Sequence, residues 1–153
     1  YVASFQAISA VGAKPVSCDI RLDNFLLNLE DAAKRITSKT KAIMPVHYTG
    51  AVGDLDALYN FAEKNNLIVI EDAAHALGAK YEDGSMVGNC RYSDMTGFSF
   101  HPVKSIAAGV GGMITTNNKL LGSHDEYDVE CISSNCDTVD SNYLFPDGPQ
   151  HAF

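Results

Sequence analysis

The feature that most constrains this chain is a regular alternation of short β-rich runs with helical patterns, from residue 14 to about residue 116. The clearest unit begins with an amphipathic helix predicted over Asp54–Lys64, in which Leu55 and Leu58 share one face. It continues into Leu67–Ile70, a continuous apolar run typical of a buried parallel strand. Such alternation is typical of βαβ units, so we predict an α/β fold with a mostly parallel sheet flanked by helices.

The other predicted elements extend this pattern along the chain. A second helix is predicted over Asn28–Ile36, and Asn28 and Asp54 are suited to cap the two helices at their first turns. Four more runs predict strands, at Lys14–Ile20, Lys41–Val46, Met95–Phe100 and Gly112–Thr116. Residues 119–153 are polar, acidic and weakly periodic. We therefore expect one folded region, residues 1–118, followed by an irregular or divergent tail, residues 119–153.

Composition narrows the class of protein. A chain of 153 residues with 46% hydrophobic content is enough for one domain with a real core. The formal net charge of -8 disfavours nonspecific binding to nucleic acid or to anionic membranes. No apolar run approaches the ~20 residues that span a bilayer, and the first residues lack the features of a signal peptide. We expect a cytoplasmic protein, and the start at Tyr1 without an initiator Met suggests a fragment of a longer chain.

The four cysteines do not suggest a metal or redox site. Cys131 and Cys136 are the only close pair, and their spacing is looser than the CxxC of redox and zinc sites. We therefore predict reduced thiols and no metal centre.

Polar side chains gather where three predicted strands end. They are His47–Tyr48, then Glu71–Asp72 with His75, and finally the run Ser99–Lys104. In open α/β sheets, ligands bind at the carboxyl ends of the strands. The sequence therefore predicts a ligand site built from these three clusters.

Asp72 comes at the end of the most apolar strand, so its carboxylate is expected to emerge into the crevice at the sheet edge. A carboxylate in such a place is costly unless a cation meets it. Two interpretations stay open: a site carboxylate, or a cap for a helix in the following residues AAHALGA. His75 lies three residues on and would share a face with Asp72, but an ordinary surface or core histidine is the alternative.

Lys104 lies in unusually apolar company, beside Pro102, Val103 and Ile106. Desolvation favours the neutral amine, which is the form that attacks a carbonyl to make a Schiff base. Glycines at 109, 111 and 112 would let the chain approach a ligand closely. A solvated surface lysine is the alternative. The glycine-rich GVGGM precedes a strand, which is the wrong order for a dinucleotide fingerprint, and no P-loop or GxSxG elbow is present.

Three strings taken together resemble the DegT family of nucleotide-sugar aminotransferases, which are pyridoxal-phosphate enzymes of the aspartate-aminotransferase (type I) fold. The strings match in order and spacing, and they are PVHYTGAVGDLDAL, IVIEDAAHALGAKY and SDMTGFSFHPVKSIAAGVGGMITT. The resemblance runs from Tyr1 to about Asn117. It implies that residues 1–118 are part of the large domain that binds pyridoxal 5'-phosphate.

The resemblance also implies roles for individual residues. Lys104 matches the lysine that forms the Schiff base with the cofactor, and Asp72 matches the acid that pairs with the protonated pyridine nitrogen. His75 matches a position near the cofactor's phenolic oxygen, and Ser99 matches a hydroxyl that contacts the phosphate. Tyr1 falls where the family has an aromatic ring stacked on the pyridine, with a frayed terminus as the alternative.

The implied activity is transfer of an amino group, usually from glutamate, to a keto sugar carried on a nucleotide diphosphate, often a 4-keto-6-deoxy hexose. A related dehydratase branch has histidine in place of the lysine, so Lys104 favours amino transfer. The full-length enzyme is expected to be a homodimer, because the site lies at a subunit interface in this family.

Three departures from the family pattern keep other interpretations open. Val110 replaces the glutamate of a GEGG string, the Gly-Thr-Ser phosphate loop that would precede Tyr1 is missing, and no second domain is recognisable beyond residue 120. One alternative is a noncatalytic remnant that folds, and may bind the cofactor, without turnover. Another is a different type I enzyme, such as a cysteine desulfurase or a decarboxylase.

Overall fold

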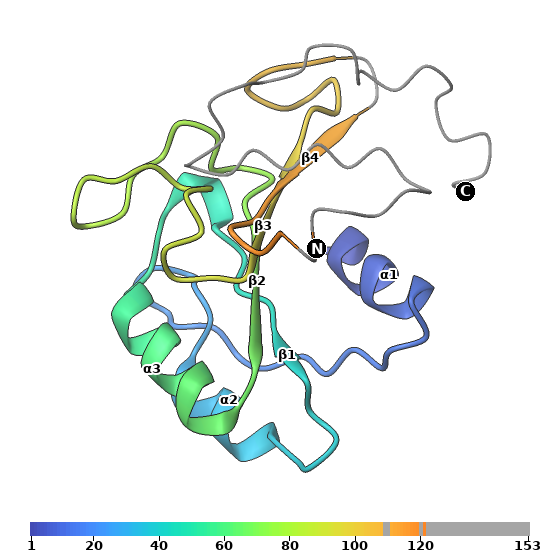
Figure 1. Ribbon diagram of the computed structural model, residues 1–153, viewed down its shortest axis with the longest axis vertical. Helices are drawn as coiled ribbons and strands as arrows, with labels where there is room; N and C mark the ends of the chain where they lie inside the picture. Colours follow the sequence, from blue (N-terminus) through green and yellow to red (C-terminus); the bar gives the residue numbers. More distant parts are fainter. Residues whose placement is uncertain (109–110, 120, 122–153) are drawn as a thin grey trace.

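The computed structural model describes residues 1–108, 111–119 and 121. The helices and strands are labelled in Figure 1. Two helices precede the first strand, and three consecutive strands follow the third helix. In chain order the elements are α1 (Val2–Ala10), α2 (Leu29–Arg35), β1 (Ala42–Ile43), the short 3₁₀ turn η1 (Tyr48–Gly50), α3 (Leu55–Asn65), β2 (Ile68–Asp72), β3 (Met95–Ser99) and β4 (Gly112–Thr115).

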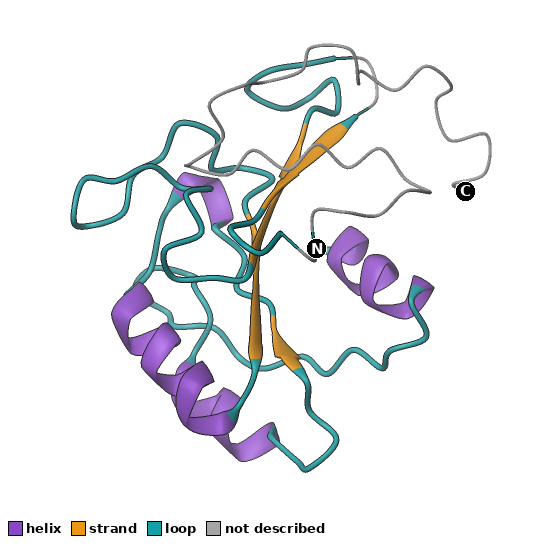
Figure 2. Cartoon of the chain, viewed as in Figure 1, coloured by secondary structure: helices purple, strands orange, loops and turns teal. Residues whose placement is uncertain are grey.

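The four strands form one sheet in the order β1-β2-β3-β4. The first three strands are parallel neighbours, and β4 pairs with β3 in the antiparallel direction. Loops make up most of the remaining chain, including the segments that leave the carboxyl ends of the strands (Figure 2). The predicted α/β class with a mostly parallel sheet is confirmed.

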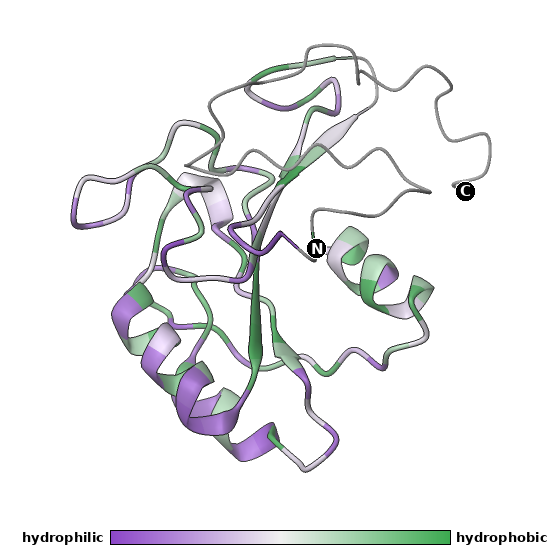
Figure 3. Cartoon of the chain, viewed as in Figure 1, coloured by the Kyte–Doolittle hydropathy of each residue, from purple (hydrophilic) through white to green (hydrophobic). Residues whose placement is uncertain are grey.

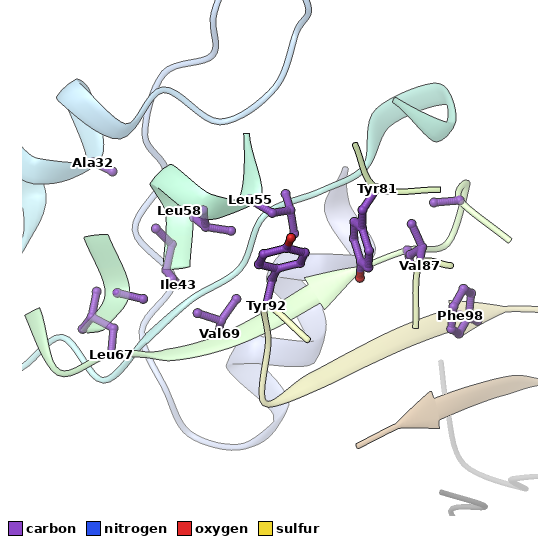
Figure 4. Packing of buried hydrophobic residues seen from close by; sticks show 13 residues of the cluster. Ala32, Ile43, Leu55, Leu58, Leu67, Val69, Tyr81, Val87, Tyr92 and Phe98 are labelled. Carbon is purple, nitrogen blue, oxygen red and sulfur yellow. The ribbon is translucent and has the colours of Figure 1, made fainter. Parts of the chain in front are cut away.

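Helices lie on both sides of this sheet: α1 is on one side, and α2 and α3 are on the other (Figure 1). The hydrophobic core lies between the sheet and α3, where Leu55 and Leu58 meet Ile43 and Val69 (Figure 4). Figure 3 colours most of β2 as hydrophobic and the residues on the outer side of α3 as hydrophilic. In contrast, α1 has no buried residue in the described structure.

Both predicted helix caps are confirmed. The Asn28 side chain accepts hydrogen bonds from the N–H groups of Glu30 and Asp31, at 2.9 and 3.3 Å. The Asp54 carboxylate accepts one from Ala57 N–H at 2.8 Å. Each cap satisfies N–H groups that have no partner within the helix, which is why these two helices begin where the sequence predicts.

The predicted strand at Lys14–Ile20 is wrong. Only Ile20 forms a bridge, an isolated antiparallel contact with Leu27, and Val16 is exposed. A β-rich sequence becomes a strand only where a second backbone lies alongside to complete its hydrogen bonds. No described segment pairs with residues 14–20 in a continuous ladder of backbone hydrogen bonds. The helix α1, which precedes them, was not predicted by the periodicity of the sequence.

Gly112 allows the close approach of β4 to β3. A Cβ atom at this position would lie 2.7 Å from the carbonyl oxygen of Phe98, which is too close for any side chain. This glycine therefore serves strand pairing, whereas the sequence suggested a close approach to a ligand. A Cβ at Gly111 would have nothing within 4 Å.

Several predictions concern residues outside the described ranges. They include Gly109, Val110, Cys131, Cys136 and nearly all of the tail over residues 119–153, of which Lys119 and Leu121 are described. Within the described ranges, no helix combines the length and the apolar character that crossing a membrane requires. Cys18 and Cys90 are free thiols.

Candidate active site

The carboxyl ends of the three parallel strands meet at one edge of the sheet. Val46, which follows β1, forms a parallel bridge with Asp72 at the end of β2, and Asp72 is in register with Gly97 of β3. The three polar clusters predicted at strand ends therefore do come together at this edge.

A pocket of about 210 Å³ opens there. Each of the three strand ends contributes to its lining, and the residues are Thr49, Ala74, His75, Val103, Lys104 and Ser105. The pocket thus combines one primary amine, one imidazole and two hydroxyl groups.

The side chain of Lys104 is partly buried in this lining and extends toward the start of the chain. Its Nζ lies 5.7 Å from the centre of the Tyr1 ring, a cation–π contact. Within residues 1–108, 111–119 and 121, Lys104 forms no salt bridge. Tyr1 is 84% exposed even with this contact, so its ring lies near Lys104 but little of it is covered by the described residues.

The apolar neighbours of Lys104 do not bury it in the way the sequence suggested. Val103 is 79% exposed and Ile106 is 58% exposed. The segment that carries Lys104 is instead a turn, in which Lys104 N–H donates to the carbonyl oxygen of His101 at 2.8 Å. Within the described residues, Lys104 is partly buried, and the neighbouring apolar side chains are mostly exposed.

Asp72 is held by two hydrogen bonds to its side chain. Ser4 Oγ donates to Oδ2 at 2.6 Å, and Ala74 N–H donates to Oδ1 at 3.1 Å. The residues that follow Asp72 form turns and not a helix, so its interpretation as a helix cap is wrong. No hydrogen bond or ion pair joins Asp72 to Lys104 in the described part of the chain.

His75 and Ser99 lie on the same edge. His75 is exposed at the pocket, and its ring centre is 6.2 Å from that of Tyr48, so it is not a core histidine. Ser99 ends β3, and its Oγ accepts a hydrogen bond from His101 N–H at 3.4 Å. His101 therefore connects Ser99 to the turn that carries Lys104.

Glu71 belongs to a different part of the structure from Asp72. Successive side chains of a strand point to opposite faces, so Asp72 meets Ser4 of α1 while Glu71 enters the core. Glu71 is fully buried and His47 is 1% exposed. The Glu71 carboxylate is 2.5 Å from His47 Nε2, accepts the hydroxyl of Tyr81 at 3.0 Å, and accepts that of Thr96 at 3.1 Å. The sequence had placed His47 and Glu71 in the ligand site, but these two side chains form a closed buried network instead.

This network changes the acid–base behaviour of its members. Burial by itself raises the pKa of Glu71, but the hydrogen bond and charge interaction with His47 and the hydroxyl of Tyr81 outweigh it. The pKa of Glu71 therefore lies below its ordinary value. Burial, together with the nearby charge of Glu71, raises the pKa of Tyr81, so this phenol stays protonated and acts as a donor.

We predict that the fold loses stability in acid because of Glu71. A carboxyl group whose pKa is lower in the folded chain than in the unfolded chain stabilises the fold in its ionised form. This contribution is complete above the unfolded value, near pH 4.5, and is lost as the pH falls through the lower folded value. The measurement is the urea unfolding free energy from pH 7 down to pH 3, for the unaltered protein and for Glu71→Gln. The difference in unfolding free energy between the unaltered protein and Glu71→Gln is expected to shrink below about pH 4.5. A difference that stays the same over this range would contradict the prediction.

The sequence alone did not identify three residues of this site. Ser4 contacts Asp72 from 68 positions away, and Thr49 and Ser105 line the pocket. Thr49 and Ser105 are neighbours of predicted clusters, so the rule of strand ends could have found them. Nothing in the sequence near Ser4 indicates a role in the site, because its contact with Asp72 depends on where α1 packs.

The arrangement fits one kind of ligand well. A primary amine, an imidazole and two hydroxyls line one small pocket, and the fixed carboxylate of Asp72 ends a strand at the same sheet edge without lining this pocket. An amine reacts with an aldehyde, a carboxylate pairs with a basic ring nitrogen, and hydroxyls bind phosphate oxygens. The site therefore has the groups that a phosphorylated pyridine aldehyde requires.

Comparisons with known proteins agree with this chemistry. The model of the DegT/DnrJ/EryC1/StrS aminotransferase family matches residues 1–127. GDP-perosamine synthase of Escherichia coli O157:H7 is 42% identical over 121 residues, covering 79% of this chain and 32% of that protein. The crystal structure of an aminotransferase from Psychrobacter cryohalolentis has a TM-score of 0.74 and 38% identity, covering 79% of this chain and 30% of that one.

A second solved structure is the PLP form of Spr1654 from Streptococcus pneumoniae. It has a TM-score of 0.68 and 37% identity, and covers 73% of this chain and 32% of that one. The chain thus spans about a third of the length of these relatives. Since the family model matches most of the sequence, the chain belongs to the DegT/DnrJ/EryC1/StrS aminotransferase family.

Proposed function

We propose that this chain carries the lysine-bearing part of the active site of a pyridoxal-phosphate-dependent sugar aminotransferase. The observation that carries the proposal is the position of Lys104. Its amine reaches a pocket built by three parallel strand ends and has no carboxylate partner among the described residues. Membership in the family supports the same role.

Five residues of the chain suit the parts of the cofactor. Lys104 is proposed to hold it covalently, and Asp72 to pair with its ring nitrogen. Tyr1 would lie against its ring, His75 near its phenolic oxygen, and Ser99 near its phosphate. When bound, the cofactor supplies a carbonyl carbon for the amine and a ring that takes up electrons.

The residues then act in sequence. Asp72, fixed by its two hydrogen bonds, keeps the ring nitrogen positively charged. Lys104 would hold the cofactor, and its amine, when free, would move a proton as a general base and acid. The partly open pocket around Lys104 leaves room for a donor to reach this amine.

The proposed substrates are glutamate as amino donor and a nucleotide-linked keto sugar, of the 4-keto-6-deoxy type, as acceptor. The similarity to GDP-perosamine synthase supports an acceptor carried on a nucleotide. We also propose that the whole enzyme works in the cytoplasm as a homodimer. A lysine, where the dehydratase branch has histidine, supports transfer of an amino group over loss of water.

An absorbance experiment tests the proposal on the intact protein. The protein is mixed with pyridoxal phosphate, freed of excess cofactor by gel filtration, and its visible spectrum is recorded before and after adding L-glutamate. We expect a retained visible band that L-glutamate bleaches and that D-glutamate, the matched control, leaves unchanged. Absence of any retained band would overturn the proposal. A band that persists with L-glutamate would indicate the noncatalytic remnant, which binds the cofactor without turnover.

A further inference from the structure

Ser4 makes a long-range contact that the helix containing it does not need. It lies in the first turn of α1, a helix with no buried residue, and is itself only partly exposed. Its hydroxyl donates to Asp72 Oδ2 at 2.6 Å, across 68 positions of the sequence. This is the length of a charge-assisted O–H···O⁻ bond, which is among the stronger kinds of hydrogen bond.

The main chain of Asp72 is already fixed by the sheet edge. Its N–H donates to the carbonyl oxygen of Pro45 at 2.9 Å, and its own carbonyl accepts His47 N–H at 3.0 Å. Rotation of the carboxylate is the remaining freedom, and that torsion of an aspartate is broad and roughly two-fold. Ala74 N–H holds one carboxylate oxygen and Ser4 holds the other. Together they fix the plane of the carboxylate.

We propose that Ser4 is a positioning residue, which holds the Asp72 carboxylate in the orientation that receives the ring nitrogen of the cofactor. The inference rests on the proposed function. Without the Ser4 hydroxyl, the carboxylate would have to be ordered when the cofactor binds, and that loss of freedom weakens binding. One hydrogen bond to a charged group corresponds to about a tenfold change in affinity.

The first turn of α1 touches the site at two points. Tyr1, at the N-cap of α1, contacts Lys104, and Ser4 follows three residues later, so the two side chains lie on one face of the turn. Loss of Ser4 could therefore act by displacing α1, and the test must separate this structural effect from orientation of the carboxylate.

A cofactor analogue without the ring nitrogen distinguishes these two effects, because only orientation of the carboxylate depends on that nitrogen. The intact protein and its variants are titrated with pyridoxal phosphate and with 1-deaza-pyridoxal phosphate, which has carbon in place of the ring nitrogen, and binding is followed by visible absorbance. For Ser4→Ala we expect about tenfold weaker binding of pyridoxal phosphate and nearly unchanged binding of the deaza analogue. Ser4→Thr, which keeps the hydroxyl, should bind both like the unaltered protein. Ser9→Ala, on the exposed part of the same helix, is the matched control.

The outcomes distinguish this inference from the proposed function. If Ser4→Ala binds pyridoxal phosphate like the unaltered protein, or weakens both compounds equally, Ser4 does not position the carboxylate and the inference is overturned alone. If the unaltered protein binds neither compound, the proposed function fails and the inference fails with it. Cofactor-free Ser4→Ala should unfold at a lower urea concentration than Ser9→Ala, because only Ser4→Ala loses a hydrogen bond to a carboxylate.

Discussion

Replacing Lys104 with alanine is expected to abolish the retained visible band and amino transfer together. Among the residues that line the pocket, only Lys104 has a primary amine, the group that forms a Schiff base with an aldehyde. Its loss also removes the group proposed to move the proton, a role worth about 10²–10⁴ in rate by itself. The measurements are the visible spectrum after gel filtration and the rate at which glutamate bleaches it.

Lys64→Ala is the matched control for this prediction. Lys64 is an exposed lysine in the last turn of α3, away from the strand ends. This variant should keep the band and the bleaching rate of the unaltered protein. Both lysine variants should unfold at similar urea concentrations, because neither removes a buried contact. A Lys104→Ala protein that still retains a band sensitive to glutamate would show that another amine holds the cofactor.

Replacing Glu71 with alanine is expected to destabilise the fold by about 3 kcal/mol or more, because it removes the shared acceptor of a buried hydrogen-bond network and each buried group left without a partner costs about 1–3 kcal/mol. The carboxylate is the common acceptor for His47, Tyr81 and Thr96, all of which are buried. Without it, His47 and Tyr81 lose their acceptor in a buried space, and each lost bond leaves a desolvation penalty, whereas Thr96 also contacts the hydroxyl of Ser93 at 3.2 Å. The measurement is the free energy of unfolding in urea at pH 7.

Glu63→Ala is the control, because Glu63 is an exposed residue near the end of α3. Its effect should stay within about 0.5 kcal/mol, as for most surface substitutions. Glu71→Gln keeps the side-chain volume and one acceptor oxygen but loses the charge. Its loss of unfolding free energy should therefore lie between those of Glu63→Ala and Glu71→Ala. Similar unfolding free energies for Glu71→Ala and Glu63→Ala would show that the network contributes nothing to stability.

Much of the fold was predictable because it depends on neighbouring residues. The period of apolar residues in α3, the continuous apolar run of β2, and the caps Asn28 and Asp54 are all local signals. The segment Lys14–Ile20 has the same kind of β-rich composition but no neighbouring strand, so composition alone was misleading there. The helix α1 was missed because its apolar residues follow no clear helical period.

The candidate site was predictable only in part. Parallel strands have their carboxyl ends at one edge, so the positions of the polar clusters at predicted strand ends were enough to place His75 and Lys104 around one pocket, with Asp72 at the same sheet edge. The proposed roles of these residues follow from the resemblance to the family. The apolar neighbours of Lys104 suggested desolvation, but Val103 and Ile106 are exposed in the described structure.

The sequence by itself determined, to within a few residues, where α2, α3, β2, β3 and β4 lie, and which polar residues follow the strands. Only the tertiary structure decided which partner each of those residues meets. Glu71 and Asp72 are adjacent in sequence, yet one joins a buried network with His47 and the other accepts a hydrogen bond from Ser4. The reason is physical: periodicity follows from the geometry of the local backbone, whereas a contact across 68 positions depends on how α1 packs beside the sheet.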